Sequence, residues 1–184
     1  MAQKKIGIVV GSLRKESYSR KIAYYLLKLL SGNYDVNVLE IGDLGLFNQD
    51  YDDEGTTPES WIVFRKNVAE QDAILFVTPE YNRSFPGVIK NAIDIASRPA
   101  GENVWTGKPG AIVSVSPSRL GGFGSNHHLS QPVSFLGIYL MPQPEEYIAD
   151  VATILDENGE ITSDYIKGSL KKFADAFTDW IDRF

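Results

Sequence analysis

The chain of 184 residues contains no cysteine and only two histidines, and these absences exclude several classes of chemistry. Without cysteine there is no disulfide, no thiolate nucleophile, no iron–sulfur cluster and no cysteine zinc site. The histidines are neighbours, His127 and His128, so the His-x-x-x-His spacing of a metal-binding helix is absent. A helix-surface or interface role is favoured for both over catalysis. No local signature indicates a catalytic triad. Side chains that could carry out a reaction by themselves are therefore scarce.

The chain also has a deficit of positive charge and no long hydrophobic run. Lysine and arginine number 18 against 24 acidic residues, which gives a net charge of −6. A nucleic-acid-binding surface needs a basic face, so this balance argues against such a partner. No run approaches the roughly 20 apolar residues that span a bilayer, and residues 6–10 are too short for a signal-peptide core. We therefore expect a cytoplasmic protein that binds neither nucleic acid nor membrane.

The apolar residues that are present follow the pattern of a parallel sheet covered on both faces by helices. Continuous apolar runs predict strands, and the amphipathic segments between them predict helices. The expected strands are 6–10, 36–41, 73–77, 111–116 and a last region shared by 137–140 and 147–149. The expected helices are 19–30, 58–68, 86–96, 126–136 and 166–184. This alternation predicts one domain, residues 1–184, with a flavodoxin-like α/β fold: a doubly wound five-stranded parallel sheet of order 2-1-3-4-5 in a three-layer sandwich.

Residues 42–58 interrupt this pattern. Glycine, aspartate, asparagine and tyrosine dominate the segment, and it has no hydrophobic periodicity. It is longer than an ordinary connection between a strand and a helix. The sequence leaves open whether this is a functional loop or a mobile one.

The loop after the first strand has the composition of a phosphate-binding site. In this fold, ligands bind beyond the carboxyl ends of the strands where the strand order reverses, here between the first and third strands. The loop carries three hydroxyls and a guanidinium, from Ser12, Ser17, Ser19 and Arg14. Short hydroxyl donors, the N–H groups at a helix start and a fork-shaped cation all bind phosphate. A serine here could instead be a simple helix N-cap, but Arg14 has no capping role.

The loops after the third and fourth strands could hold a flat ring. Tyr81 can pack against a planar ligand while Asn82 and backbone amides bond to its edge, although the same residues could form an ordinary turn before a helix. The later loop contains Gly121 and Gly122, which would let the backbone approach a flat ligand closely. Glycine-rich loops are frequent, so this second signal is weak by itself.

Two segments resemble the NADPH-dependent FMN reductase family, whose members include quinone, chromate and azo-dye reductases. The first reads Gly-Ser-Leu-Arg at 11–14, with Ser17 and Ser19 after it. The second reads Pro-Glu-Tyr-Asn-x-Ser-x-Pro-Gly-x-x-Lys-Asn-Ala-Ile-Asp at 79–94. The resemblance extends over residues 5–140. One departure is Ser19-Arg20, where relatives often have asparagine.

The resemblance implies a role for each matching residue. It places the FMN phosphate against Ser12, Arg14, Ser17 and Ser19. It places the isoalloxazine ring between two groups of residues: Pro79, Glu80, Tyr81 and Asn82 on one side, and Ser116 with the backbone of Gly121 and Gly122 on the other. The helix that carries Lys90, Asn91 and Asp94 belongs to a dimer interface in relatives. The implied assembly is a homodimer, with a homotetramer as the other possibility.

The function implied by the resemblance needs no catalytic side chain and no metal, because the cofactor carries the redox chemistry. A hydride passes from NADPH or NADH to bound FMN, and then to a small-molecule acceptor such as a quinone, a free flavin or an azo compound. One alternative is a flavodoxin-type FMN electron carrier with no substrate turnover, against which Arg14 argues. Another is a flavin-independent binding module or hydrolase on the same fold.

Overall fold

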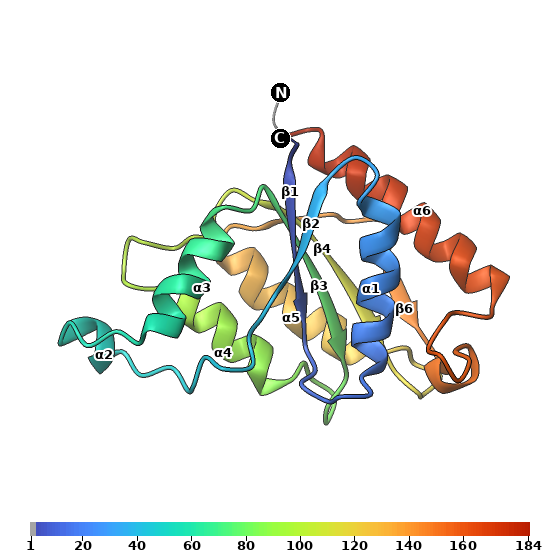
Figure 1. The fold of residues 1–184 in the computed structure, drawn as a ribbon, viewed down its shortest axis with the longest axis horizontal. Coiled ribbons are helices and arrows are strands. Elements are labelled where there is room, and N and C mark those ends of the chain that lie inside the picture. The colour runs from blue at the N-terminus through green and yellow to red at the C-terminus, as the bar shows by residue number, and fades with distance from the viewer. Residues whose placement is uncertain (1–2) are drawn as a thin grey trace.

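The computed structural model describes residues 3–184, in which strands and helices alternate (Figure 1). The strands are β1 (Lys5–Val10), β2 (Asp35–Leu39), β3 (Ala73–Pro79), β4 (Pro109–Val115), β5 (Tyr139–Leu140) and β6 (Glu146–Ile148). The α-helices are α1 (Tyr18–Leu30), α2 (Asp50–Asp53), α3 (Glu59–Ala69), α4 (Gly87–Ala96), α5 (Phe123–Phe135) and α6 (Asp164–Ile181). A 3-10 helix, η1, spans Val151–Thr153. No helix in this part of the chain is both long and apolar enough to cross a membrane.

The strands form a parallel sheet with the predicted order β2-β1-β3-β4-β5. The fifth position is shared by two short strands, because Leu140 of β5 lies beside Gly110 and Glu146 of β6 lies beside Val113. Between them the chain leaves the sheet at Pro142 and Pro144. Proline has no N–H to donate to a strand neighbour, so the predicted last strand is divided at these residues.

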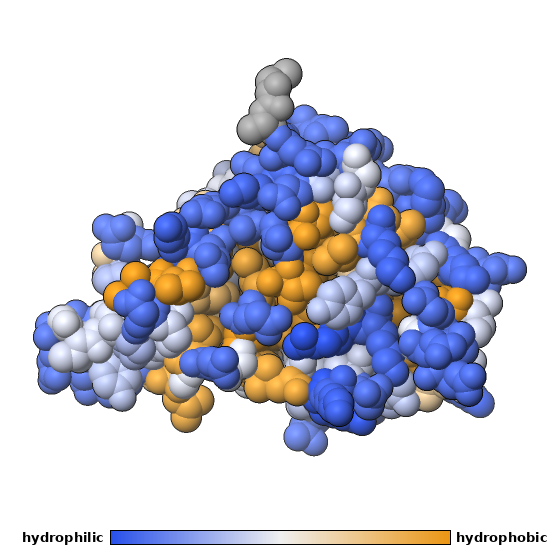
Figure 2. Space-filling view, in the orientation of Figure 1, coloured by the Kyte–Doolittle hydropathy of each residue, from blue (hydrophilic) through white to orange (hydrophobic). Residues whose placement is uncertain are grey.

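Helices cover both faces of the sheet and make a three-layer sandwich (Figure 1). One core joins the sheet to α1 and α6, and the other joins it to α3, α4 and α5. The three central strands β1, β3 and β4 are almost entirely buried, which explains their continuous apolar sequences. The outer strand β2 is partly exposed, and Figure 2 shows apolar surface over it between α1 and α3.

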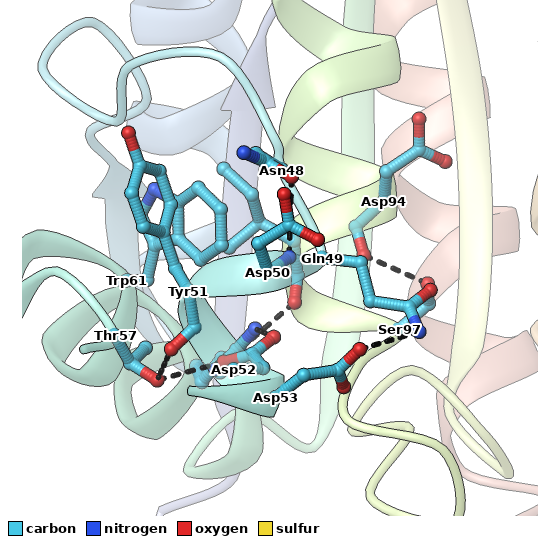
Figure 3. A network of polar contacts seen from close by, with 12 residues as sticks. Asn48, Gln49, Asp50, Tyr51, Asp52, Asp53, Thr57, Trp61, Asp94 and Ser97 are labelled. Carbon is cyan, nitrogen blue, oxygen red and sulfur yellow. Dashed lines mark hydrogen bonds and ion pairs between the residues drawn. The ribbon is translucent and has the colours of Figure 1, made fainter. Parts of the chain in front are cut away.

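Segment 42–58, which the sequence predicts to be irregular, contains the short helix α2 and is tied to α3 by polar contacts (Figure 3). The carboxylate of Asp52 accepts two hydrogen bonds from Arg65, at 2.8 and 2.7 Å, and a third from the Thr57 hydroxyl at 2.8 Å. The side chain of Asp52 is 4% exposed and that of Arg65 is 14% exposed. The bonds from Arg65 hold the pKa of Asp52 below its usual value, and Thr57 adds to this effect while burial opposes it.

A second set of contacts attaches the same segment to α4. The side chain of Asn91 accepts a hydrogen bond from the N–H of Phe47 at 2.8 Å and donates one to the carbonyl of Gly45. The Phe47 ring stacks on Trp61 with 5.5 Å between centroids. Asn91, which the sequence motif associates with a dimer helix, therefore anchors a loop of its own chain.

Candidate functional site

A cavity of about 170 Å³ lies at the carboxyl edge of the sheet, where the strand order reverses between β1 and β3. Three loops form its walls, namely those that follow β1, β3 and β4. Its lining residues are Ser12, Arg14, Ser17, Tyr18, Ser19, Pro79, Glu80, Tyr81, Val115 and Pro117. The cavity is therefore at the position that the predicted topology indicates for a ligand.

The β1 loop presents hydroxyls and a cation to this cavity. Ser17 is the N-cap of α1, and its Oγ accepts a hydrogen bond from the N–H of Arg20 at 3.2 Å. Ser12 Oγ accepts a weak bond from the N–H of Arg14 at 3.4 Å. Within residues 3–184, the side chains of Ser19 and Arg14 have no hydrogen-bond partner. Ser17 is therefore a helix N-cap. The Ser19 hydroxyl and the Arg14 guanidinium, by contrast, can donate hydrogen bonds to an anion.

The β3 loop ends in a tight reversal that exposes an aromatic ring. Tyr81 and Ser84 exchange two backbone hydrogen bonds, at 2.9 and 3.0 Å. The two residues between them, Asn82 and Arg83, have φ values of +51° and +64°. Positive φ at both central positions is the geometry of a type I′ turn, in which asparagine is well tolerated and arginine is not. The turn leaves Tyr81 47% exposed beside the cavity, where its ring can stack on a flat ligand.

The β4 loop turns at Gly121 and Gly122, which have φ values of +58° and +81°. A Cβ on Gly121 would lie 2.8 Å from the backbone of Tyr147, and one on Gly122 would lie 2.9 Å from Ser114 Cβ. The Ser114 hydroxyl also donates to the carbonyl of Gly121 at 2.8 Å. Glycine is therefore required here by the protein's own packing against β4 and β6, which the sequence does not reveal. Nearby, Ser116 Oγ accepts from the N–H of Ser118 at 3.1 Å.

Most of the predicted site residues line the cavity. The seven that do are Ser12, Arg14, Ser17, Ser19, Pro79, Glu80 and Tyr81. The other four, Asn82, Ser116, Gly121 and Gly122, lie on the same loops outside its lining. Sequence reasoning missed Tyr18, Val115 and Pro117. The position of Tyr18 between two predicted serines was an available signal, and the other two flank Ser116.

No metal site competes with this cavity in the part of the chain that the structure describes, where no three histidines or acidic residues are grouped to hold an ion. Both histidines lie on the exposed side of α5, as predicted. His127 packs its ring against Phe123, at 4.2 Å between centroids, and its Nε2 is 3.1 Å from the Tyr147 hydroxyl.

Comparison with known proteins identifies the family. Residues 4–152 match the profile of the NADPH-dependent FMN reductases. The chain belongs to this family. A quinone reductase of Pseudomonas putida is 48% identical over 176 residues, which cover 96% of this chain and 94% of that protein. A 2-hydroxy-1,4-benzoquinone reductase of Burkholderia sp is 43% identical, with 96% of each chain covered.

A solved structure that is 40% identical to this chain has the same fold. It is FerB, a flavoenzyme NAD(P)H:(acceptor) oxidoreductase from Paracoccus denitrificans, with 40% sequence identity and a TM-score of 0.91. The match covers 98% of each chain. The family implies bound FMN, and the donor set of the cavity fits it: the hydroxyls and Arg14 suit a phosphate, and Tyr81 suits a flat ring.

Proposed function

We propose that this protein transfers a hydride from NADPH or NADH, through bound FMN, to a quinone. The observation that carries the proposal is the single cavity in which a hydroxyl- and arginine-bearing loop faces an exposed tyrosine. The quinone as acceptor is supported by the names of the relatives that are 48% and 43% identical. Free flavins and azo compounds are the other acceptors in this proposal.

In this proposal the β1 loop holds the FMN phosphate. Arg14 supplies a charge-assisted bond, and Ser12, Ser17 and Ser19 supply hydroxyls close to the N-terminal end of α1. Ser12, Ser17 and Ser19 are only 2–4% exposed, so neighbouring atoms already restrict their side chains before a ligand binds. The site therefore loses little side-chain entropy when it closes on a phosphate.

The β3 and β4 loops would hold the ring. Pro79, Glu80 and Tyr81, which line the cavity, would form one wall together with Asn82. Ser116 and the Gly121–Gly122 turn would form the other. When bound, FMN supplies the redox chemistry, since it can accept a hydride from nicotinamide and pass it on. The chain's own residues bind and orient the reactants and need no nucleophile. Tyr81, which is half exposed in the cavity lining, would stack on a planar reactant.

The experiment that tests this function is anaerobic reduction of the reconstituted protein. Purified protein is mixed with FMN and gel-filtered, and its visible absorbance is recorded before and after NADPH or NADH, and again after a benzoquinone. We expect FMN to co-elute, its absorbance to be bleached by the nicotinamide, and the quinone to restore it. Absence of bound flavin would contradict the proposal. Bound flavin that neither nucleotide bleaches would indicate the flavodoxin-type electron carrier instead.

We further propose that residues 1–184 form one FMN-binding domain that works in the cytoplasm as a homodimer. A groove between α4 and α5 supports the dimer. Its volume is about 360 Å³, and apolar residues such as Ile93, Pro132 and Leu136 share its lining with charged residues such as Lys90 and Asp94. Phe135 also lines this groove and is 88% exposed. A second copy of this chain would cover it, and a homotetramer would need a further interface.

A further inference from the structure

Helix α5 begins without a capping side chain of its own. Its N-cap is Gly122, and its first turn contains no acidic residue. The first N–H groups of a helix have no partner within the helix and need an acceptor from elsewhere. One acceptor comes from the β3 loop, because Glu80 Oε2 accepts a hydrogen bond from the N–H of Ser125 at 3.2 Å. This bond joins the β3 loop to the first turn of α5, which directly follows the β4 loop.

The side chain of Ser125 makes a second connection, between α5 and the end of β3. Its hydroxyl donates to the carbonyl of Pro79 at 2.8 Å and lies 3.0 Å from Thr78 Oγ1. Ser125 and Thr78 are both fully buried. The first turn of α5 is thus bonded to the last two residues of β3, directly before the segment that carries Tyr81.

The two segments also approach so closely that a side chain at Gly124 would have to displace one of them. A Cβ on Gly124 would lie 3.0 Å from Glu80 Oε2 and 3.0 Å from the carbonyl oxygen of Arg83. Arg83 in turn donates to Glu80 Oε1 at 3.1 Å, so both oxygens of this carboxylate have partners in the protein. One turn further along α5, His128 Nδ1 lies 3.2 Å from Ser84 Oγ.

We propose that Ser125 and Glu80 are positioning residues, which hold the β3 loop against the first turn of α5 and so set the distance between the two walls of the flavin site. The inference rests on the proposed function, because it requires the ring to lie between these loops. Dispersion contacts weaken steeply when a gap widens by about 0.5–1 Å. A small outward movement of the β3 loop would therefore weaken the binding of a flat ring.

Two variants disturb this junction in different ways, and each has a matched control. Ser125→Ala removes the hydroxyl, whereas Gly124→Ala removes no polar group and places a methyl between the segments. Ser169→Ala is the control for the first, because Ser169 Oγ donates at 2.8 Å to Glu146 Oε2, a buried carboxylate on β6. Gly168→Ala is the control for the second, because a Cβ at that position in α6 meets nothing within 4 Å.

The measurements are FMN affinity by flavin fluorescence, the visible circular dichroism of bound flavin, and the melting temperature of each apoprotein. One neutral hydrogen bond is worth at most about a tenfold change in an equilibrium constant, so we expect FMN affinity to fall by up to that factor in Ser125→Ala. Gly124→Ala should also bind FMN more weakly, and both should alter the flavin dichroism. Both controls should bind FMN as the wild type does.

Two results would overturn parts of this reasoning separately. If Ser125→Ala and Gly124→Ala bind FMN with wild-type affinity and dichroism while their melting temperatures fall, the junction is structural only and the inference is wrong. If the wild-type protein binds no FMN in the same assay, the proposed function itself is contradicted. Should Ser125→Ala fail to fold, Gly124→Ala decides, since it leaves every hydrogen-bonding group in place.

Discussion

The bidentate ion pair between Asp52 and Arg65 allows a quantitative test of how segment 42–58 is held. Asp52→Ala removes an anion that is 4% exposed and leaves the Arg65 guanidinium, 14% exposed, without its charge partner. Breaking a buried pair in this way costs about 3–5 kcal/mol. Because Arg65 keeps its bond to the carbonyl of Ile95 at 2.9 Å and has some access to water, we expect a loss of about 3 kcal/mol, at the lower end.

The assay is urea denaturation at neutral pH, with Asp53→Ala as the control. Asp53 belongs to the same short helix but is exposed and bonds only to Gln49, so its removal should change the unfolding free energy by under about 0.5 kcal/mol. A double variant, Asp52→Ala with Arg65→Met, should recover part of the loss, because no unpaired charge remains. If Asp52→Ala proves as stable as Asp53→Ala, the ion pair contributes nothing net and the reasoning is refuted.

The same pair predicts a direction for the pH dependence of stability. The folded-state pKa of Asp52 lies below the ordinary value of 3.8, chiefly because of the bonds from Arg65. The contribution of ionised Asp52 to folding stability is therefore complete above its unfolded-state pKa and is lost as the pH falls through its folded-state pKa. The difference in stability between the wild type and Asp52→Ala should be constant from about pH 7 to pH 5 and shrink below about pH 4.

Three further predictions concern the flavin site and the assembly. Arg14→Ala should weaken FMN binding at least tenfold, since a charge-assisted bond contributes about 1.5–3 kcal/mol, and unchanged affinity in a fluorescence titration would show that the phosphate lies elsewhere. Gly121→Ala should lower both FMN affinity and melting temperature, because its Cβ would meet Tyr147 at 2.8 Å. Gly45→Ala, with a similar φ of +65° but open space, should only lower the melting temperature, and equal effects of the two would exclude the steric explanation. Phe135→Asp should convert the proposed dimer to monomer in light scattering, and an unchanged mass would contradict the α4–α5 interface.

The errors in element boundaries have physical causes. The sequence predicts a helix at 126–136, yet α5 begins at Phe123. Local capping residues mark most helix starts, but here the acceptor is Glu80, which lies 45 residues away from Ser125. The helix α2 was missed because its four residues are too few to show periodicity. The strand predicted at 36–41 ends at Leu39. Because β2 lies at the sheet edge and is only partly buried, its hydrophobic pattern marks the strand end less clearly.

The sequence by itself determined the fold class and the hydroxyl and guanidinium groups of the proposed phosphate site. Strands buried on both faces require continuous apolar runs, and a phosphate requires hydroxyls and a cation, so both leave local patterns. The tertiary structure alone decided how the loops meet. Ser125 bonds to Pro79 over 46 residues of sequence, and Gly121 is required by the backbone at Tyr147. Such contacts depend on the register and spacing of the packed strands and helices, which no local pattern of residues encodes.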